Sequence, residues 1–246
     1  YFCSGGLSMP PPEQKYLKRY GIVNLRSIKA NSRLGFKYFT GKHVFSKKQV
    51  FVKTDPTSGQ AAAREGTVLK ILNAHPHRAL FPRLIAHETQ GRFAFVATEF
   101  ISGKTLNTFL AQRSPLPRSQ EAFLLNQLAR ILEILQTNKV IHRDIRPQNL
   151  MVRPKIGKPF LVLIDFAFAV GLPPNPLPEL AFLLNRPKLL QRLGSRYRAA
   201  ADHWDDAYSM HQIAQEVAGN YKCKYPQIWQ SLNGSIGELT FSCPNP

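Results

Sequence analysis

The sequence predicts an α+β fold in two parts, a small β-rich half followed by a larger helical half. Strand-like runs of aromatic and β-branched residues are concentrated before residue 101, with one helical segment among them. Residues 121–138 carry apolar side chains at helical spacing. A turn-forming stretch at 102–104 separates the halves. The chain has 246 residues, 43% of them hydrophobic, which is enough to bury a core in one large domain or two small lobes.

In the first half, alternating patterns predict strands and one helical period predicts a helix. Residues 10–34 open with a proline run and carry little periodicity, so we expect an arm that leads into the first strand. Residues 34–53 show two strand-like runs around a polar turn, which predicts a hairpin. Helix formers with a helical apolar period follow at 61–74, and two further strands are expected at 82–88 and 92–100.

The second half is predicted to be helical with a short β insert. In chain order, the expected elements are a short helix at 105–112, an amphipathic helix at 121–138, short strands near 140–142, 149–152 and 160–165, and a helix at 204–217. Residues 171–198 are proline-rich and irregular, and the residues after 217 give only weak signals.

The charge balance indicates an anionic partner without naming one. Thirty-three Lys and Arg stand against fifteen Asp and Glu, a formal charge of +18. The stretch from Lys15 to Lys53 holds eleven basic residues and no acidic one, and a second basic cluster lies at 186–198. These patches predict docking on an anionic surface, either an acidic protein, lipid headgroups or a phosphorylated sugar. The alternative is a solvated basic surface with no specific partner. No recognition motif supports specific nucleic-acid binding.

The cysteines and the hydropathy indicate a cytoplasmic protein. Cys3, Cys223 and Cys243 are odd in number and widely spaced, which argues against a disulfide framework and a structural zinc site. No run approaches the roughly 18 apolar residues of a transmembrane helix, and no signal-peptide pattern is present. The alternatives are a peripheral position at a membrane and export as an effector into a host cytosol. Residues 1–8, which precede Met9, are expected to be fragment remainder.

Because carboxylates are scarce, an acidic residue inside an apolar stretch needs an explanation. Asp165 follows five apolar residues, where an unpaired carboxylate is costly, so a counter-ion is expected. Two strands joined by the turn at 153–159 would place Asn149 and Asp165 side by side. An amide oxygen and a carboxylate suit Mg²⁺ bound together with nucleotide phosphates. Asp144, on the loop before Asn149, is then a candidate to accept the proton of an attacking hydroxyl.

These residues carry a family resemblance. The stretch HRDIRPQN at 142–149, followed by Asp165-Phe166-Ala167, resembles the catalytic loop and the DFG motif of the protein kinase superfamily. VFVK, ending at Lys53, resembles the strand whose lysine holds the α- and β-phosphates, and Glu65 resembles the ion-pair partner of that lysine.

The resemblance continues along the chain in family order. ATEFISGKTL at 97–106, which contains Glu99, is similar to the hinge between the two kinase lobes. GSRYRAAA at 194–201 resembles a degenerate version of the family motif that ends the substrate-binding segment. DDAYSM at 205–210 is similar to the start of the helix that follows it, with Asp206 in the position of the conserved family Asp.

The resemblance implies a bilobal protein-kinase-like fold with a small β-rich N-lobe and a truncated helical C-lobe. The expected division is an N-terminal arm at 1–29, an N-lobe at 30–101 and a reduced C-lobe at 102–246. ATP would lie between the lobes near the hinge at Ser102. The implied function is an ATP-dependent phosphotransferase, and the preferred hypothesis is a Ser/Thr protein kinase that acts on a protein substrate. The alternatives are a kinase of a sugar or lipid-linked sugar, similar to lipopolysaccharide-core kinases, and a catalytically inactive scaffold.

The resemblance also assigns roles to individual residues. Asp144, Arg146 and Asn149 are implied as catalytic: Asp144 orients the acceptor hydroxyl and Arg146 neutralises the transferring group. Asn149 and Asp165 are implied as Mg²⁺ ligands. The expected nucleotide contacts are Lys53, Glu65, Gly35, Glu99 and Asp165.

Three neighbours of the site are expected to be structural rather than catalytic. His142 is expected to support the loop by hydrogen bonding, and Arg143 to contact an anionic group on the segment after Asp165. Asp206 is expected to be a brace that accepts backbone N–H bonds from the catalytic loop. Asp202 and Asp205 are expected to form the acidic first turn of the last helix.

Departures from the family pattern favour a reduced kinase. Of the phosphate-loop glycines only Gly35 is present, with Ala30 and Ser32 where glycines are expected and Arg33 as a nearby positive charge. Ala167 replaces the DFG glycine. The short C-terminal region implies that the usual C-terminal helical subdomain is missing or vestigial.

Overall fold

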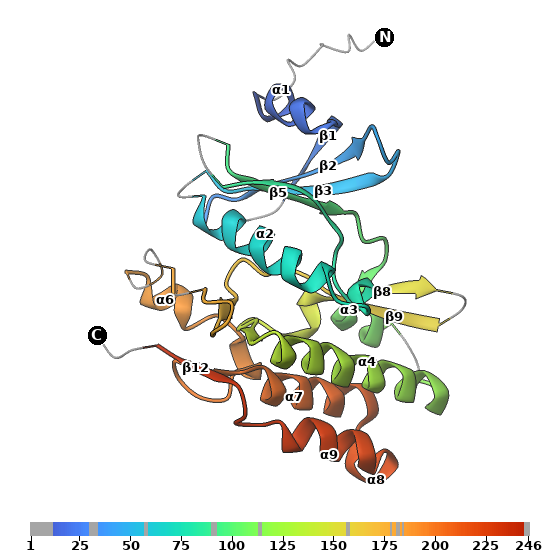
Figure 1. The fold of residues 1–246 in the computed structure, drawn as a ribbon. Helices are drawn as coiled ribbons and strands as arrows, with labels where there is room; N and C mark the ends of the chain where they lie inside the picture. Colours follow the sequence, from blue (N-terminus) through green and yellow to red (C-terminus); the bar gives the residue numbers. More distant parts are fainter. Residues whose placement is uncertain are drawn as a thin grey trace, which may run out of the picture. The chain divides into compact units, whose positions relative to one another are not determined.

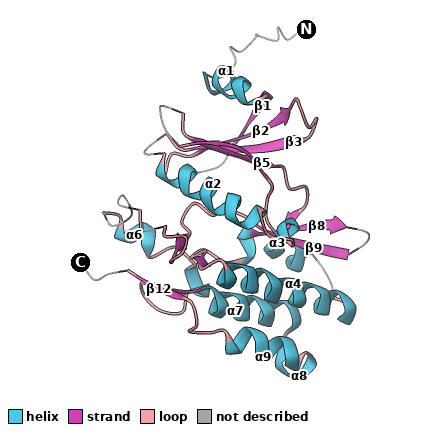
Figure 2. Cartoon of the chain, viewed as in Figure 1, coloured by secondary structure: helices cyan, strands magenta, loops and turns pink. Residues whose placement is uncertain are grey.

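The computed structural model describes residues 12–29, 34–56, 59–89, 93–112, 115–155, 158–177, 179–180, 183 and 185–243. The expected α+β class is confirmed, since a mixed sheet-and-helix chain is observed (Figures 1 and 2). Two compact units are present, Tyr1–Ala63 with Ile85–Phe100 and Arg64–Leu84 with Ile101–Pro246. The lobe boundaries expected from the sequence stay a prediction.

A five-stranded sheet forms the framework of the first unit. Its order is β1-β2-β3-β5-β4, and the pairs β1–β2, β2–β3 and β3–β5 are antiparallel. The strands are β1 (Ile22–Ile28), β2 (Lys37–His43), β3 (Gln49–Thr54), β4 (Leu84–Glu88) and β5 (Phe95–Glu99). The hairpin expected at 34–53 and the two strands expected at 82–88 and 92–100 are therefore confirmed.

The core of the first unit lies on one face of this sheet. Phe39, Val50 and Val52 are each at most 3% exposed and form a cluster with Leu17. Leu17 ends helix α1 (Pro12–Leu17), so this short helix belongs to the core of the sheet unit.

The segment before β2 corrects the sequence analysis. An arm is expected over 10–34, but the structure places α1, the 3-10 turn η1 (Lys18–Tyr20) and β1 within this stretch. The register of β1 against β2 shifts between Val23 and Arg26, and Asn24 between them has a φ of 56°. A β-bulge interrupts the alternation of side chains, so this strand lacks the period-two pattern by which strands are recognised.

Helix α2 (Gln60–Asn73) confirms the helix expected at 61–74. Its first turn is capped from outside, because the Asp55 carboxylate accepts a hydrogen bond from the backbone N–H of Ala61 at 3.0 Å. Such a cap satisfies one of the amide groups that have no partner within the helix.

Helices dominate the second unit. They are α3 (Leu106–Ala111), α4 (Arg118–Thr137), α6 (Pro187–Leu190), α7 (Asp206–Ala218), α8 (Tyr221–Lys224) and α9 (Pro226–Gly234), with 3-10 turns η2 (Arg78–Leu80), η3 (Pro147–Asn149) and η4 (Ser195–Tyr197). The expected amphipathic helix is α4, whose residues Leu124, Leu128, Ile131 and Leu135 are fully buried and which contacts α7 and β9 (Figure 1). Within the described ranges, no helix is both long and apolar enough to cross a membrane.

Short strands position the loops of the second unit. They are β6 (Lys104–Thr105), β8 (Leu150–Lys155) and β9 (Lys158–Leu163) in one sheet, β7 (Val140–Ile141) paired with β10 (Val170–Gly171), and β11 (His203–Asp205) paired with β12 (Thr240–Ser242). Gln127 of α4 donates to the Pro159 carbonyl at 3.1 Å and accepts from the Leu161 N–H at 2.9 Å. The side chain of a helix therefore satisfies the backbone of β9.

The turn at 102–104 brings two backbones into contact. Gly103 has a φ of 150°, a conformation that L side chains rarely adopt. A Cβ at this position would collide with the carbonyl oxygen of Val152 in β8. Glycine is therefore required where this turn crosses β8.

The last expected helix begins later than the sequence indicates. The helix expected at 204–217 is present as α7, but Trp204 and Asp205 lie in β11 and α7 starts at Asp206. Asp205 is the N-cap and accepts hydrogen bonds from two N–H groups of the first turn, at 2.8 and 3.1 Å. Asp202 lies before β11, so its expected place in the helical turn is wrong. β12 supplies a pairing partner for β11 that local periodicity does not predict.

Candidate active site

The expected catalytic loop runs between two anchored strands. It leaves β7, which pairs with β10, and enters β8 through the turn η3. Its residues are unusually buried for polar side chains: His142 is fully buried, and Arg143, Asp144 and Asn149 are 1%, 3% and 6% exposed. Buried polar groups must find partners, so the contacts of this loop define its geometry.

Asp206 holds the start of the loop. Its two carboxylate oxygens accept hydrogen bonds from the backbone N–H groups of His142, at 2.5 Å, and Arg143, at 3.1 Å. Complete burial raises the pKa of Asp206 to about 7, although these two hydrogen bonds lower it. The brace expected from the sequence is confirmed.

His142 supports the loop from within. Its Nδ1 accepts a hydrogen bond from the backbone N–H of Asp144 at 3.2 Å, and its Nε2 lies 3.0 Å from the carbonyl oxygen of Ile164. Accepting at Nδ1 and donating at Nε2 is the pattern of one neutral tautomer. The expected structural role of His142 is confirmed, and its ring connects the loop to the end of β9.

The carboxylate of Asp144 is the centre of the loop. Oδ1 accepts the backbone N–H of Gly194 at 2.7 Å, while Oδ2 lies 2.8 Å from Nδ2 of Asn149 and 3.1 Å from Nη2 of Arg146. Burial raises the pKa of Asp144 to about 6; Arg146 and the Gly194 N–H lower it, and Asp165 raises it. A carboxyl with this pKa is ionised at neutral pH and basic enough to accept a proton.

The ends of β8 and β9 bring Asn149 beside the Asp165 segment. The N–H of Ile164 donates to the carbonyl oxygen of Asn149 at 2.9 Å, and Asp165 is the next residue, with a φ of 68°. Because Nδ2 of Asn149 is bonded to Asp144, its amide oxygen remains to act as an acceptor. The adjacency expected from the sequence is therefore observed in the backbone, whereas the metal-ligand role stays a prediction.

The donor set tests whether a divalent cation fits. No group of three His, Cys, Asp or Glu side chains that could hold a metal ion occurs within the described part of the chain. Asn149 and Asp165 would supply one amide oxygen and one carboxylate, which is the donor set of Mg²⁺ bound through one or two side chains together with substrate phosphates. The residues fit that arrangement.

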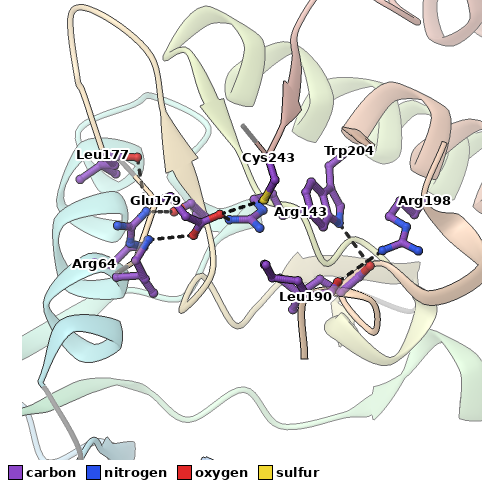
Figure 3. Close-up of polar contacts among 11 residues, drawn as sticks. Arg64, Arg143, Leu177, Glu179, Leu190, Arg198, Trp204 and Cys243 are labelled. Carbon is purple, nitrogen blue, oxygen red and sulfur yellow. Dashed lines mark hydrogen bonds and ion pairs between the residues drawn. The ribbon is translucent and has the colours of Figure 1, made fainter. Parts of the chain in front are cut away.

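Arg143 makes a buried ion pair with the segment after Asp165 (Figure 3). Its Nη1 lies 2.6 Å from Oε2 of Glu179, with the two side chains 0% and 9% exposed. The guanidinium also lies over the rings of Trp204, at 4.3 Å, and Phe241, at 5.0 Å. The anionic partner expected for Arg143 is thus confirmed, and it is Glu179.

Two residues of this site are absent from the sequence-based assignment. Glu179 is the sole acidic residue of 171–198, and that isolation in a basic stretch is the signal that could have identified it. Gly194 has a φ of 72° and presents its N–H to Asp144. The GSRYRAAA motif indicates a substrate segment but not a hydrogen bond to the Asp144 carboxylate.

In the first unit, the expected nucleotide contacts lie on the sheet and its loops. Lys53, on β3, is 3% exposed, and its Nζ lies 5.0 Å from the centre of the Phe36 ring. Gly35 is exposed, with a φ of 74° that favours glycine. Glu99 ends β5 opposite Val50.

For Glu65 and for the residues before Gly35, the expected roles stay predictions. Glu65, on α2, is 6% exposed, and its ion pair with Lys53 stays a prediction. The expected positions of Ala30, Ser32 and Arg33 lie outside the described residues.

A hollow in the second unit lies at the turn expected to be the hinge. It has a volume of about 720 Å³ and is lined by residues that include Ser102, Lys104, Phe109, Val152 and Lys158. None of its lining residues comes from the catalytic loop, so the chemistry is located by the buried side chains and not by this cavity.

Comparison with known proteins identifies the same region. A family model described as the protein kinase domain matches residues 30–204. The serine/threonine-protein kinase ATG1a of Arabidopsis thaliana is 30% identical over 148 residues, which are 59% of this chain and 23% of that protein. PknA, a serine/threonine-protein kinase of Nostoc sp., is 35% identical over 103 residues, 42% of this chain and 18% of that protein. A probable serine/threonine-protein kinase 2 of Plasmodium falciparum is 25% identical over 181 residues, 72% of this chain and 33% of that protein. The chain thus spans a third or less of the length of these relatives.

Proposed function

The chain belongs to the protein kinase domain family, and we propose that it transfers the γ-phosphoryl group of ATP to serine or threonine hydroxyls of a protein substrate. The observation that carries the proposal is the Asp144 carboxylate, buried and oriented by Gly194, Asn149 and Arg146. The choice of serine and threonine rests on these relatives, which are serine/threonine-protein kinases by name. A kinase of a sugar or lipid-linked sugar and an inactive scaffold have no support among these relatives.

In the proposed reaction, bound MgATP supplies the phosphoryl group and the metal charge that stabilises its transfer. Asp144 orients the acceptor hydroxyl and takes its proton at a carboxylate oxygen. Arg146, 3.1 Å from that carboxylate and half-buried, keeps Asp144 ionised and adds positive charge beside the transferred group. Its contact with Asp144 is observed, and its contact with a phosphoryl group is proposed.

The other candidate residues would bind the nucleotide and its metal ion. Lys53, positioned by Glu65, contacts the α- and β-phosphates. Asn149 and Asp165 hold Mg²⁺ through oxygen atoms. Gly35 and Glu99 are proposed to contact the nucleotide from the strand loop and the end of β5.

Labelled ATP tests the proposal. The purified chain is incubated with Mg²⁺, a generic protein substrate and either γ- or α-labelled ATP, and the labelled amino acid is identified. The expected result is label on serine or threonine from γ-labelled ATP alone. The Asp165→Ala variant should lose this label, whereas Asp202→Asn, a change at an exposed acid before β11, should retain it.

Three results would contradict the proposal. Label from the α-position would indicate nucleotidyl transfer, and label on tyrosine would remove the serine/threonine assignment. Label that persists in Asp165→Ala would show that the proposed metal ligand is not needed.

A further inference from the structure

The turn between β2 and β3 exposes apolar side chains at its tip. Phe45 is 82% exposed and Val44 is 43% exposed; Ile236 in the second unit, at 37%, is the other large hydrophobic residue that is exposed in the described ranges. Single exposed hydrophobic residues are ordinary, but two adjacent ones at the extremity of a hairpin leave an aromatic ring in water. The described residues therefore leave an apolar surface at this tip exposed to water.

The tip is held in a defined shape. The N–H of Val44 donates to the Gly21 carbonyl at 2.8 Å, and Nδ1 of His43 lies 2.8 Å from Oγ of Ser46. The Phe45 ring packs edge-on against His43 and over Gly21, where a Cβ would approach the ring within 2.7 Å. These contacts fix the backbone of the tip and place the Phe45 ring beside His43 and Gly21.

Beside this tip lies a small cationic hollow. It has a volume of about 280 Å³, and Arg26, Lys42 and Lys47 line it together with the amide side chains of Asn24 and Gln49. No acidic residue is among its lining residues. The three cations are exposed and make no ion pair with any described residue.

The β-bulge of β1 builds this hollow. The register shift between Val23 and Arg26 places Arg26 opposite Thr40 of β2, while Lys42 pairs with Val23. A bulge re-aims side chains at a sheet edge. The bulged strand contributes a guanidinium, β2 an ammonium group and the turn another, all around one cavity that is large enough for a phosphate group.

We propose that this hairpin tip, Phe45 and Val44 with the hollow of Arg26, Lys42 and Lys47, docks the chain on an anionic lipid surface. The apolar side chains enter the boundary between headgroups and acyl chains, and the hollow receives the phosphate of a lipid headgroup. The sequence from Lys15 to Lys53 contains no acidic residue, so this stretch itself adds no negative charge that would be repelled by the leaflet.

An acidic protein is the less favoured partner. A protein would have to offer a pocket to cover a protruding phenyl ring, whereas a lipid leaflet supplies an apolar layer below its charged headgroups at every position. An exposed aromatic residue suits the apolar layer of the leaflet, and the neighbouring cations suit its charged headgroups.

Vesicle co-sedimentation tests this docking, without ATP and therefore independently of any kinase activity. The chain is expected to bind vesicles of phosphatidylcholine with phosphatidylserine at physiological salt, and to bind pure phosphatidylcholine vesicles weakly. Each of Lys42→Gln and Lys47→Gln should reduce affinity about five-fold, the contribution of one cation near an anionic leaflet. Phe45→Ser should reduce it about ten-fold through lost apolar burial.

Matched variants separate the tip from general charge and hydrophobicity. Lys70→Gln, an equal charge change on α2, and Ile236→Ser, the exposed hydrophobic residue of the second unit, should leave vesicle binding unchanged. Circular dichroism melts confirm that the tip variants remain folded. The proposal is overturned if the wild-type chain ignores the anionic vesicles or if tip and control variants bind equally. Tip-dependent binding to polyglutamate without vesicle binding would instead assign the surface to an acidic protein.

Discussion

At Asp144, burial and hydrogen bonding act on the pKa in opposite directions. Removal from water raises the pKa to about 6, and the nearby Arg146 and the Gly194 N–H lower it. Both carboxylate oxygens accept from donors, so the side chain is oriented before any substrate arrives. In its proposed role as general base, Asp144 is therefore ionised at neutral pH and retains a useful affinity for a proton.

The phosphorylation rate should therefore depend on the pKa of Asp144. Because this pKa is raised, the active carboxylate is lost as pH falls through about 6, and the rate should fall about ten-fold for each pH unit below that. The measurement is the initial rate of label transfer across pH, with melts that confirm folding at the acid end. In Arg146→Gln, loss of the nearby positive charge should move the midpoint to higher pH. A rate that stays constant down to the ordinary range of aspartate would contradict this role.

At the residue scale, local motifs predicted the candidate residues whose roles are proposed above. Asp144, Asn149 and Asp165 are recognisable because loop spacing and an acid after an apolar run are properties of neighbouring sequence. Glu179 and Gly194 contact the loop from 36 and 50 residues away, as the pairs Arg143–Glu179 and Asp144–Gly194 show. No periodicity encodes such pairings.

At the element scale, the Arg143–Glu179 pair joins the catalytic loop to the segment after β10 (Figure 3). The strand β12 and the residue after it contact this ion pair. The Phe241 ring packs against the Arg143 guanidinium, and Cys243 Sγ lies 3.7 Å from Glu179 Oε2. Burial lowers the pKa of Arg143, and Glu179 acts against that shift by stabilising the charged form. Three segments distant in sequence are thus organised around one buried cation.

Breaking this pair should destabilise the fold. Glu179→Gln leaves the Arg143 charge buried without its counter-charge, which costs about 3 kcal/mol or more. Glu133→Gln is the matched control, because Glu133 pairs with Arg130 on the exposed face of α4, with side chains 60% and 47% exposed. That pair contributes about 0.5 kcal/mol or less. Urea unfolding measures both free energies, and equal losses in the two variants would show that the buried pair has no special role.

The elements themselves were predictable where their patterns are regular. The α4 helix and the β2–β3 hairpin follow clear periods and appear where expected. The β1 strand is interrupted by its bulge, and β11 is defined by pairing with β12, which begins 35 residues after β11 ends. Both exceptions depend on partners and not on local sequence.

For the whole molecule, the main electrostatic property is a charge of +18. The described ion pairs engage few of the 33 basic side chains, and most of the cations face water. Like charges repel in the folded chain more than in the expanded unfolded chain, so net charge lowers the free energy of unfolding.

Salt should consequently stabilise this protein. Between about 0.01 M and 0.1 M ionic strength the Debye length falls from about 30 Å to about 10 Å, which screens long-range repulsion but spares the buried Arg143–Glu179 pair. The melting temperature measured by differential scanning fluorimetry should rise over that range, and sucrose at equal osmolality serves as the control for solute effects. A melting temperature that falls with added salt would show that attractive surface pairs outweigh the repulsion.

By itself, the sequence determined the fold class, the protein kinase resemblance and the order of the residues Lys53, Glu65, Asp144, Asn149 and Asp165, because these depend on composition, period and local spacing. The tertiary structure alone decided which groups hold Asp144 and Arg143, and where Phe45 and its neighbouring cations emerge. Burial makes that difference: a polar group removed from water must be paired, and only the folded backbone determines which distant group is close enough to be its partner.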